Sequence, residues 1–170
     1  QSQINPHFLN NTLEIINWEA RLNGNYKVSS MIEALSTMLE ETMNRKAKQF
    51  HSVAEEMAYA DAYLYIISQR FGAKFQCTKK VDESLLDVRV PRLIIQPLVE
   101  NALYHGIKES DQERGNIRIR IEKEEPDILL ILVMDDGAGM SLEECGRLNK
   151  ILRMEERPEE IRAFGVRNVH

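Results

Sequence analysis

The sequence predicts an α+β protein in which an N-terminal pair of antiparallel helices precedes a mixed domain of strands and helices. Two observations support this prediction. Up to about residue 71 the apolar residues recur with the period of a helix, and from about residue 73 most of them alternate with the period of a strand. We therefore place a boundary near residue 72 and expect domains at residues 1–72 and 73–170.

The first two helices are predicted from two apolar stripes that a short turn separates. The turn is the Asn-Gly-Asn sequence at residues 23–25. Ser29 or Ser30 is available as the N-cap of the second helix, with Glu33 in its first turn. Helices joined by so short a connection pair antiparallel. Their stripes consist of Leu9, Leu13, Ile16 and Ala20 in the first helix and Met31, Leu35, Met38 and Thr42 in the second.

A third helix follows a polar, basic break at residues 45–49, and Gly72 is placed to end it. Because the helical stripes need further partners, we expect a small bundle that a second copy of the chain could complete. The apolar stripe of the third helix consists of Val53, Met57, Ala60, Leu64, Ile67 and Phe71.

Beyond residue 72 the pattern predicts four strands and one helix. The strands with one polar face lie around residues 75–78, 88–90 and 117–122, and a helix is predicted over residues 91–105. Residues 128–134 are uninterrupted apolar sequence, which fits a strand covered on both faces or lying centrally in a helix-backed sheet. The helix is expected to present Ile94, Leu98 and Ala102 on one face.

Composition excludes several classes of function. Hydrophobic residues make up 43% and charged residues 29% of the 170, as in ordinary soluble domains. The net charge of −5 argues against nucleic acid as a partner, since phosphate-backbone binders have a basic surplus. Cys77 and Cys145 have no metal-ligand spacing, which favours a reducing compartment, and no stretch has the length of a membrane span. Because the chain begins at Gln1, we expect it to be an excised segment.

His7 follows Pro6 at the predicted start of the first helix, where its imidazole would be exposed. Taken alone, such a histidine is more often an ordinary surface residue. The string QINPHFL at residues 3–9, followed by NTL at 11–13, closely resembles the phosphoacceptor box of the LytS/YesM-like sensor histidine kinases. The resemblance implies that His7 is autophosphorylated and that the first two helices form a dimerisation hairpin. Phe8 stands where many other histidine kinases have an acidic residue, as in the family as a whole, so the general base stays open.

A second candidate site is formed by Asn101, His105 and Lys108, whose spacing puts them on one face of a helix. A solvated polar face has the same spacing. The strings QPLVENA at 96–102 and HG at 105–106 resemble the N box of the same kinases and of the wider GHKL ATPases, which include gyrase and the mismatch-repair ATPases. The resemblance implies that the Asn101 amide binds Mg²⁺ and that the other two side chains lie near phosphate oxygens.

Pro97 occupies the position at which ATP hydrolases of that superfamily have a water-activating glutamate, four residues before the metal-binding asparagine. Its presence suits an enzyme that delivers phosphate to His7 and not to water. Glu100 lies next to Asn101 but points away from it on the helix, so we assign it only a weak role.

The string DDGAG at residues 135–139 follows the apolar strand and could be a tight turn alone. It resembles the first glycine box of the GHKL ATPases. The resemblance implies that Asp135 accepts a hydrogen bond from the exocyclic amine of adenine, while Gly137 and Gly139 let the backbone approach the base. Asp136 replaces the usual asparagine, which we expect to make the pocket more acidic.

The string AFGVRNV at residues 163–169 resembles the second glycine box. Gly165 and Asn168 match it and would contribute to phosphate binding, whereas Ala163 replaces the first glycine and would alter that site. The charged segment at residues 141–162 is expected to be a mobile ATP lid. The family continues beyond this point, so the resemblance implies a GHKL-type α/β sandwich that is truncated at its C-terminus.

Together, the four motifs predict an ATP-dependent autokinase that uses ATP and Mg²⁺, forms a homodimer through the N-terminal helices and passes phosphate to a response regulator. We expect the cytoplasmic region of a bacterial inner or plasma membrane protein, tethered through a segment absent from this chain. Three alternatives remain: a non-catalytic nucleotide-sensing or scaffold module, a plain ATP hydrolase, and a structural helical dimer. The stimulus, the cognate regulator and whether His7 is phosphorylated within or across protomers stay open.

Overall fold

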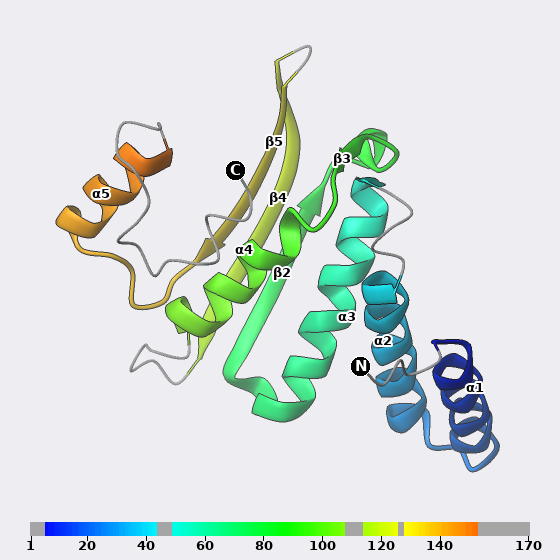
Figure 1. Cartoon of the computed structure of the whole chain (residues 1–170). Helices are drawn as coiled ribbons and strands as arrows, with labels where there is room; N and C mark the ends of the chain where they lie inside the picture. Colours follow the sequence, from blue (N-terminus) through cyan, green and yellow to red (C-terminus); the bar gives the residue numbers. More distant parts are fainter. Residues whose placement is uncertain (1–5, 44–48, 108–113, 126–127, 153–170) are drawn as a thin grey trace, which may run out of the picture. The chain divides into compact units, whose positions relative to one another are not determined.

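The computed structural model describes residues 6–43, 49–107, 114–125 and 128–152. The chain divides into two units, one of residues 1–72 with 89–92 and the other of residues 73–88 with 93–170. Residues 89–92, which the sequence analysis assigned to the second domain, therefore lie with the first unit. Helices and strands are both present, which confirms the predicted α+β class (Figure 1). None of the described helices is long and apolar enough to cross a membrane.

In the first unit, α1 (Pro6–Leu22) and α2 (Tyr26–Met43) are joined by the predicted turn. Gly24 has a φ of 67°, and the N–H groups of Gly24 and Asn25 donate to carbonyls of the last turn of α1. The side chain of Asn25 then accepts from the N–H of Val28 at 3.3 Å and caps α2. The predicted N-cap at Ser29 or Ser30 is therefore wrong, since α2 already begins at Tyr26.

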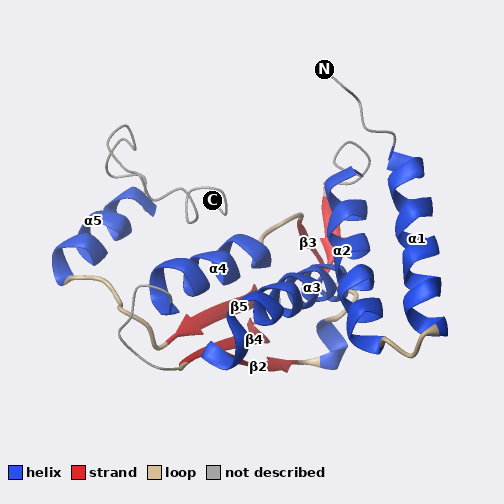
Figure 2. Cartoon of the chain, turned by 90° about the horizontal axis from the view of Figure 1, so that it is seen from below, coloured by secondary structure: helices blue, strands red, loops and turns tan. Residues whose placement is uncertain are grey.

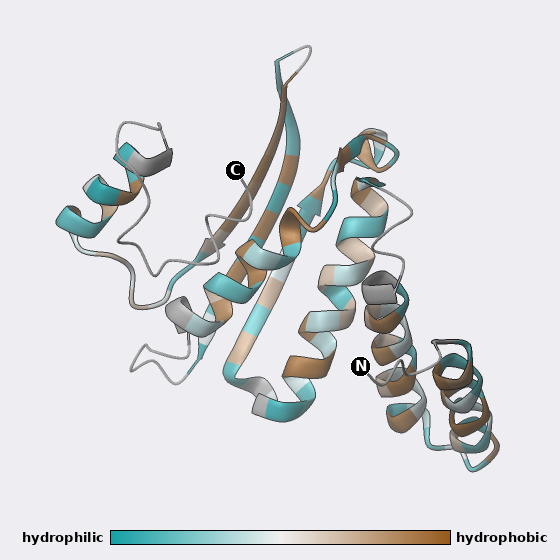
Figure 3. Ribbon diagram, in the orientation of Figure 1, coloured by the Kyte–Doolittle hydropathy of each residue, from teal (hydrophilic) through white to brown (hydrophobic). Residues whose placement is uncertain are grey.

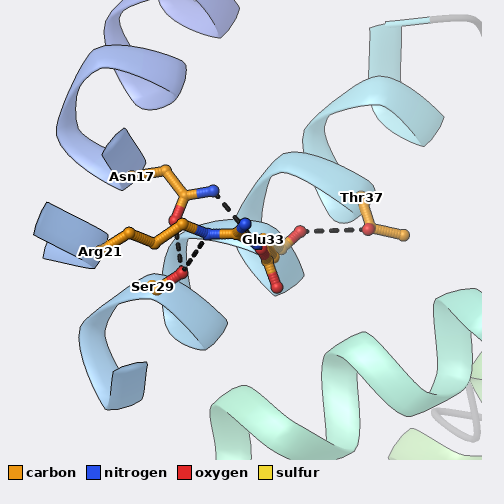
Figure 4. A network of polar contacts seen from close by, with 5 residues as sticks. All are labelled: Asn17, Arg21, Ser29, Glu33 and Thr37. Carbon is orange, nitrogen blue, oxygen red and sulfur yellow. Dashed lines mark hydrogen bonds and ion pairs between the residues drawn. The ribbon is translucent and has the colours of Figure 1, made fainter. Parts of the chain in front are cut away.

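A polar network joins α1 to α2 (Figure 4). The hydroxyl of buried Ser29 donates to Oδ1 of Asn17 at 2.6 Å and accepts from Nε of Arg21 at 3.1 Å. Glu33 accepts from Nδ2 of Asn17 at 3.4 Å and pairs with the Arg21 guanidinium. The hydrogen bonds from Arg21 and then Asn17 hold the pKa of the Glu33 carboxyl below its usual value. Because later residues of α1 meet earlier residues of α2, the two helices run antiparallel.

The apolar contact between these helices differs in part from the predicted stripes. Leu13 and Ala20 of α1 are buried with Ile32 of α2, and Leu39 packs against them. Leu35, expected on the buried face of α2, is 41% exposed. Met31 and Met38 of the predicted stripe are partly buried. The most buried face of α2 includes the polar Ser29, so it is offset from the apolar stripe.

The rest of the first unit is β1 (Phe50–Ser52), α3 (Val53–Phe71) and β3 (Arg89–Pro91). β1 pairs antiparallel with β3, with His51 opposite Val90. Ser52 and Glu55 form a capping box at the start of α3, and Gly72 ends the helix with a φ of 66°, as predicted. The buried face of α3 confirms the predicted stripe at Val53, Met57, Ala60, Leu64 and Ile67.

A buried contact between His51 and Glu56, which the sequence pattern does not reveal, lies at the start of α3. Nδ1 of His51 is 3.1 Å from Oε1 of Glu56, and the two side chains are only 7% and 2% exposed. Polar groups this deeply buried require hydrogen-bond partners. The pair therefore ties strand β1 to helix α3.

The second unit is built on a three-stranded sheet of β2 (Phe75–Val81), β4 (Gly115–Glu125) and β5 (Ile128–Asp135), in the order β2-β4-β5. β2 is parallel to β4, and β5 is antiparallel to it. The parallel pair requires a crossover, which contains α4 (Ile95–Asn101), and α4 lies over one face of the sheet (Figure 2). The alternating apolar residues of β4 and the continuous apolar run of β5 are visible in Figure 3.

Two expectations for this unit were wrong in part. Among the described strands β5 lies at an edge and is only half-buried, not central or covered on both faces. Helix α4 begins at Ile95 and not at residue 91, because β3 occupies residues 89–91 and Leu93 has a φ of 57°. Its buried residues are Ile95 and Val99, so the predicted face is displaced by one position at Ile94 and Leu98, whereas Ala102 is buried as predicted.

The α1–α2 network predicts a stability difference between two neighbouring serines. Ser29→Ala removes the donor to Asn17 and should lower the free energy of unfolding by about 1–2 kcal/mol. Ser30→Ala is the matched control, since both variants share the same small gain in helix propensity. Urea unfolding followed by circular dichroism measures both. Equal stabilities of the two variants would show that the network does not stabilise the hairpin.

Candidate functional site

His7 lies in the first turn of α1 with its side chain exposed to solvent. Its Nδ1 is 3.3 Å from Nδ2 of Asn11, one helical turn later. A side-chain amide can donate to or accept from an imidazole, so this contact can hold either neutral tautomer of the ring. Asn11 therefore orients the imidazole at an exposed helix start, which is the arrangement that a histidine nucleophile requires.

Helix α1 has a second apolar stripe, on the side facing away from α2. The positions are spaced as in the seam of a coiled coil, and Trp18 is 66% exposed. Exposed apolar stripes of this kind mark surfaces of association. The stripe consists of Phe8, Ile15, Trp18 and Leu22.

Asn101 is the last residue of α4 and is partly buried. The next six residues, Ala102–Ile107, are wound as a π-helix. The prediction that Asn101, His105 and Lys108 share one helix face assumed α-helical spacing, which ends at Asn101. The side chain of His105 and the whole of Lys108 lie outside the described residues. Glu100 accepts a hydrogen bond from Gln96 at 2.5 Å, so its carboxylate is engaged on its own helix. Short π-helical segments are frequent at functional sites.

Asp135 is the last residue of β5 and is exposed. Its Oδ1 accepts from the N–H of Gly137 at 3.0 Å, which forms a tight turn closed by the side chain. A carboxylate has two oxygens, so this bond leaves acceptor capacity for a ligand. Gly139 has a φ of 70°, a conformation that only glycine adopts without strain.

Asp136 is bound to the neighbouring strand. Its two carboxylate oxygens accept from the backbone N–H and the side-chain amide of Asn116, both at 2.6 Å. These bonds, the side-chain one first, hold the pKa of Asp136 below its ordinary value of 3.8. The expectation that Asp136 acidifies a pocket is therefore refined, because this carboxylate is engaged within the sheet.

The segment predicted to be a lid contains α5 (Leu142–Leu152), which begins at a capping box between Ser141 and Glu144. The remainder of the segment lies outside the described residues, and so do Ala163, Gly165 and Asn168. Asn101 and Asp135 belong to the second unit, where α4 contacts β5. His7 belongs to the first unit.

Residues 1–75 match the model of the histidine kinase family, a range that includes His7. The chain is 36% identical over 140 residues to the sensor histidine kinase YesM of Bacillus subtilis and 32% identical over 139 residues to the sensor protein LytS of Oceanobacillus iheyensis. The chain is a relative of the YesM- and LytS-type sensor histidine kinases. It is also 31% identical over 139 residues to the sensor histidine kinase BtsS of Escherichia coli.

These alignments cover 82% of the chain but only 23% to 24% of each relative, so the chain spans about a quarter of their length. Among solved structures, the chain resembles the histidine kinase domain from the Erythrobacter litoralis EL346 blue-light activated histidine kinase. That match has 21% identity and a TM-score of 0.43 and covers 82% of this chain and 67% of that one.

The Asp136–Asn116 contact predicts a pH-dependent contribution to stability. Because the folded pKa of Asp136 is lowered, the contribution is complete above its ordinary value of 3.8 and is lost as pH falls through the lower folded value. Wild-type stability should therefore decline more steeply below about pH 4 than that of Asp136→Asn. Urea unfolding at neutral and acidic pH measures this. Parallel pH profiles of the two proteins would contradict the assignment.

Replacement by alanine should have opposite effects on stability at Gly139, after the Asp135 turn, and at Gly146, in α5. Gly139→Ala should destabilise the protein by about 1–2 kcal/mol, because alanine is strained at positive φ. Gly146→Ala, in α5, should stabilise it by up to about 1 kcal/mol, because a Cβ there meets no atom within 4 Å and alanine favours a helix. Thermal unfolding compares them, and equal melting temperatures would argue against the strained turn.

Proposed function

We propose that the parent protein is an ATP-dependent protein-histidine kinase of a two-component system, in which His7 accepts phosphate and passes it to an aspartate of a response regulator. The observation that supports this most directly is His7 itself. It is an exposed, amide-oriented imidazole at a helix start, within the segment that matches the histidine kinase family. The chain is also similar to sensor histidine kinases YesM and BtsS.

The second unit is proposed to be a GHKL-type α/β sandwich that binds ATP. Asp135 would accept a hydrogen bond from the exocyclic amine of adenine. Asn101 would bind Mg²⁺ through its amide oxygen, and His105, Lys108, Gly165 and Asn168 would contact phosphate oxygens. The described residues fit such a ligand, because an exposed carboxylate, a glycine of positive φ and a partly buried amide lie in one unit. Bound Mg²⁺ would neutralise phosphate charge during the transfer.

His7 would act as the nucleophile. One imidazole nitrogen forms a bond to the γ-phosphorus of ATP, the bond from that phosphorus to the bridging oxygen breaks, and ADP leaves. The imidazole proton passes to a base. That base is not the residue directly after His7, because Phe8 has no basic group. In the second step a carboxylate of the response regulator attacks the phosphorus and the N–P bond breaks. Asn11 would hold the ring during both steps.

The helical part, residues 1–72, is proposed to form a homodimer as well as to contain the phosphoacceptor. The exposed apolar stripe of α1 supports this, because a second copy of the same helix would bury it. The parent protein is proposed to be a bacterial membrane sensor whose cytoplasmic region contains this chain, with the membrane segment elsewhere in the protein.

Labelling of the intact protein with γ-³²P-ATP tests the proposal. An acid-labile, base-stable label is expected, and His7→Ala should remove it while leaving Mg–ADP affinity unchanged. Asp135→Asn should weaken Mg–ADP binding by about tenfold or more, since it removes a hydrogen bond to a charged acceptor. The two variants therefore distinguish loss of the phosphate acceptor from loss of nucleotide binding.

The labelling experiment also distinguishes the alternative activities. Phosphate release that persists in His7→Ala would indicate a plain ATP hydrolase. Nucleotide binding without any label would indicate a sensing or scaffold module. The absence of both binding and label would leave only a structural helical dimer.

A further inference from the structure

The end of β5 is joined to the start of β4 by three hydrogen bonds between two residues. The N–H of Asp136 donates to the carbonyl of Asn116 at 3.3 Å. The backbone N–H and the side-chain amide of Asn116 donate to the two carboxylate oxygens of Asp136. The contact adds one more pair to the antiparallel ladder, next to the pairing of Ile117 with Asp135.

This contact uses both oxygens of the Asp136 carboxylate. In an ordinary antiparallel pair the N–H of Asn116 would donate to a main-chain carbonyl. Here a carboxylate oxygen of Asp136 takes that place, so the backbone can leave the sheet and turn. The second carboxylate oxygen accepts from the Asn116 amide. An asparagine at position 136 would have only one acceptor oxygen for these two donors.

The contact adjoins the proposed adenine-binding carboxylate. Asp135 is preceded by strand β5 and followed directly by Asp136, which is bound to β4. Its own Oδ1 is engaged by the N–H of Gly137 at 3.0 Å. The backbone on both sides of Asp135 is therefore held, and the direction of its side chain depends on the bond that Asn116 makes.

We propose that Asn116 is a positioning residue for adenine recognition, which orients the carboxylate of Asp135 through the side chain of Asp136. This inference rests on the proposed function, in which Asp135 accepts a hydrogen bond from the exocyclic amine of adenine. Asn116 itself would not contact the nucleotide. Its effect is on the choice of base and not on the binding of phosphates.

The choice of base is measured by comparing Mg–ADP with Mg–IDP, because hypoxanthine has a carbonyl where adenine has the exocyclic amine. The intact wild-type protein should bind ADP about tenfold or more tightly than IDP, as expected for a hydrogen bond to a charged acceptor. Asn116→Ala should weaken ADP binding about three- to tenfold and leave IDP binding unchanged, so that the preference falls. Isothermal titration calorimetry measures all four affinities.

Two further variants separate positioning from general stability. Asp136→Asn should lower the ADP preference as Asn116→Ala does. The double variant should lower it no further, because the two residues act through one contact. Lys123→Ala, an exposed change at the far end of β4, is the control and should leave the preference unchanged. A merely structural role for Asn116 would weaken ADP and IDP binding equally.

The outcomes distinguish this inference from the proposed function. If the wild-type protein binds neither nucleotide, or binds both equally, the adenine site itself is refuted and the inference with it. If the wild-type protein prefers ADP and both single variants retain the full preference, only the role of Asn116 is refuted. Additive losses in the double variant would also overturn it, because they would show independent action.

Discussion

Strand β4 sets the geometry of the second unit, because it is buried on one face and paired along both edges. Ile117, Ile119 and Ile121 are at most 1% exposed, and the residues between them are polar. A shift of one residue in register would bring Arg118 and Arg120 into the core in their place, which is strongly unfavourable. The alternation therefore fixes which face of β4 is buried and excludes register shifts by an odd number of residues. In the observed register, Ile117 pairs with Asp135 at the end of β5.

Polar contacts determine the alignment of elements that apolar faces hold together. At the end of β5, Asp136 replaces a main-chain acceptor and lets the chain turn after Asp135. In the first unit, buried Ser29 plays a comparable part, because its hydroxyl joins two residues of α1 and so orients the helix that contains His7. In both units an apolar face holds the elements together, while one satisfied polar contact determines their alignment.

The elements that the sequence predicted correctly are those determined by local chemistry. The stripe of α3, the alternation of β4 and the glycine-ended helices at Gly24 and Gly72 depend on residues close together in the chain. The buried face of α2, the pairing of β1 with β3 and the His51–Glu56 contact depend on partners that periodicity does not reveal. These features were therefore missed or misplaced.

The same distinction applies to the candidate site. The motif strings around His7, Asn101 and Asp135 are continuous in the chain and could be found without the structure. The role of Asn116 could not, because an asparagine in an exposed strand position is unremarkable until its partner, 20 residues away, is known. The π-helical winding after Asn101 was also invisible, since its sequence has ordinary helical spacing.

We propose the turn after β5 as the nucleotide site of the parent histidine kinase. Hydrogen–deuterium exchange of the intact protein, with and without Mg–ADP, tests it most directly. If the turn binds nucleotide, exchange should be slower at residues 135–139 and at the end of α4 when Mg–ADP is bound, with α1 unchanged. Protection elsewhere in the protein, with none at residues 135–139, would contradict it.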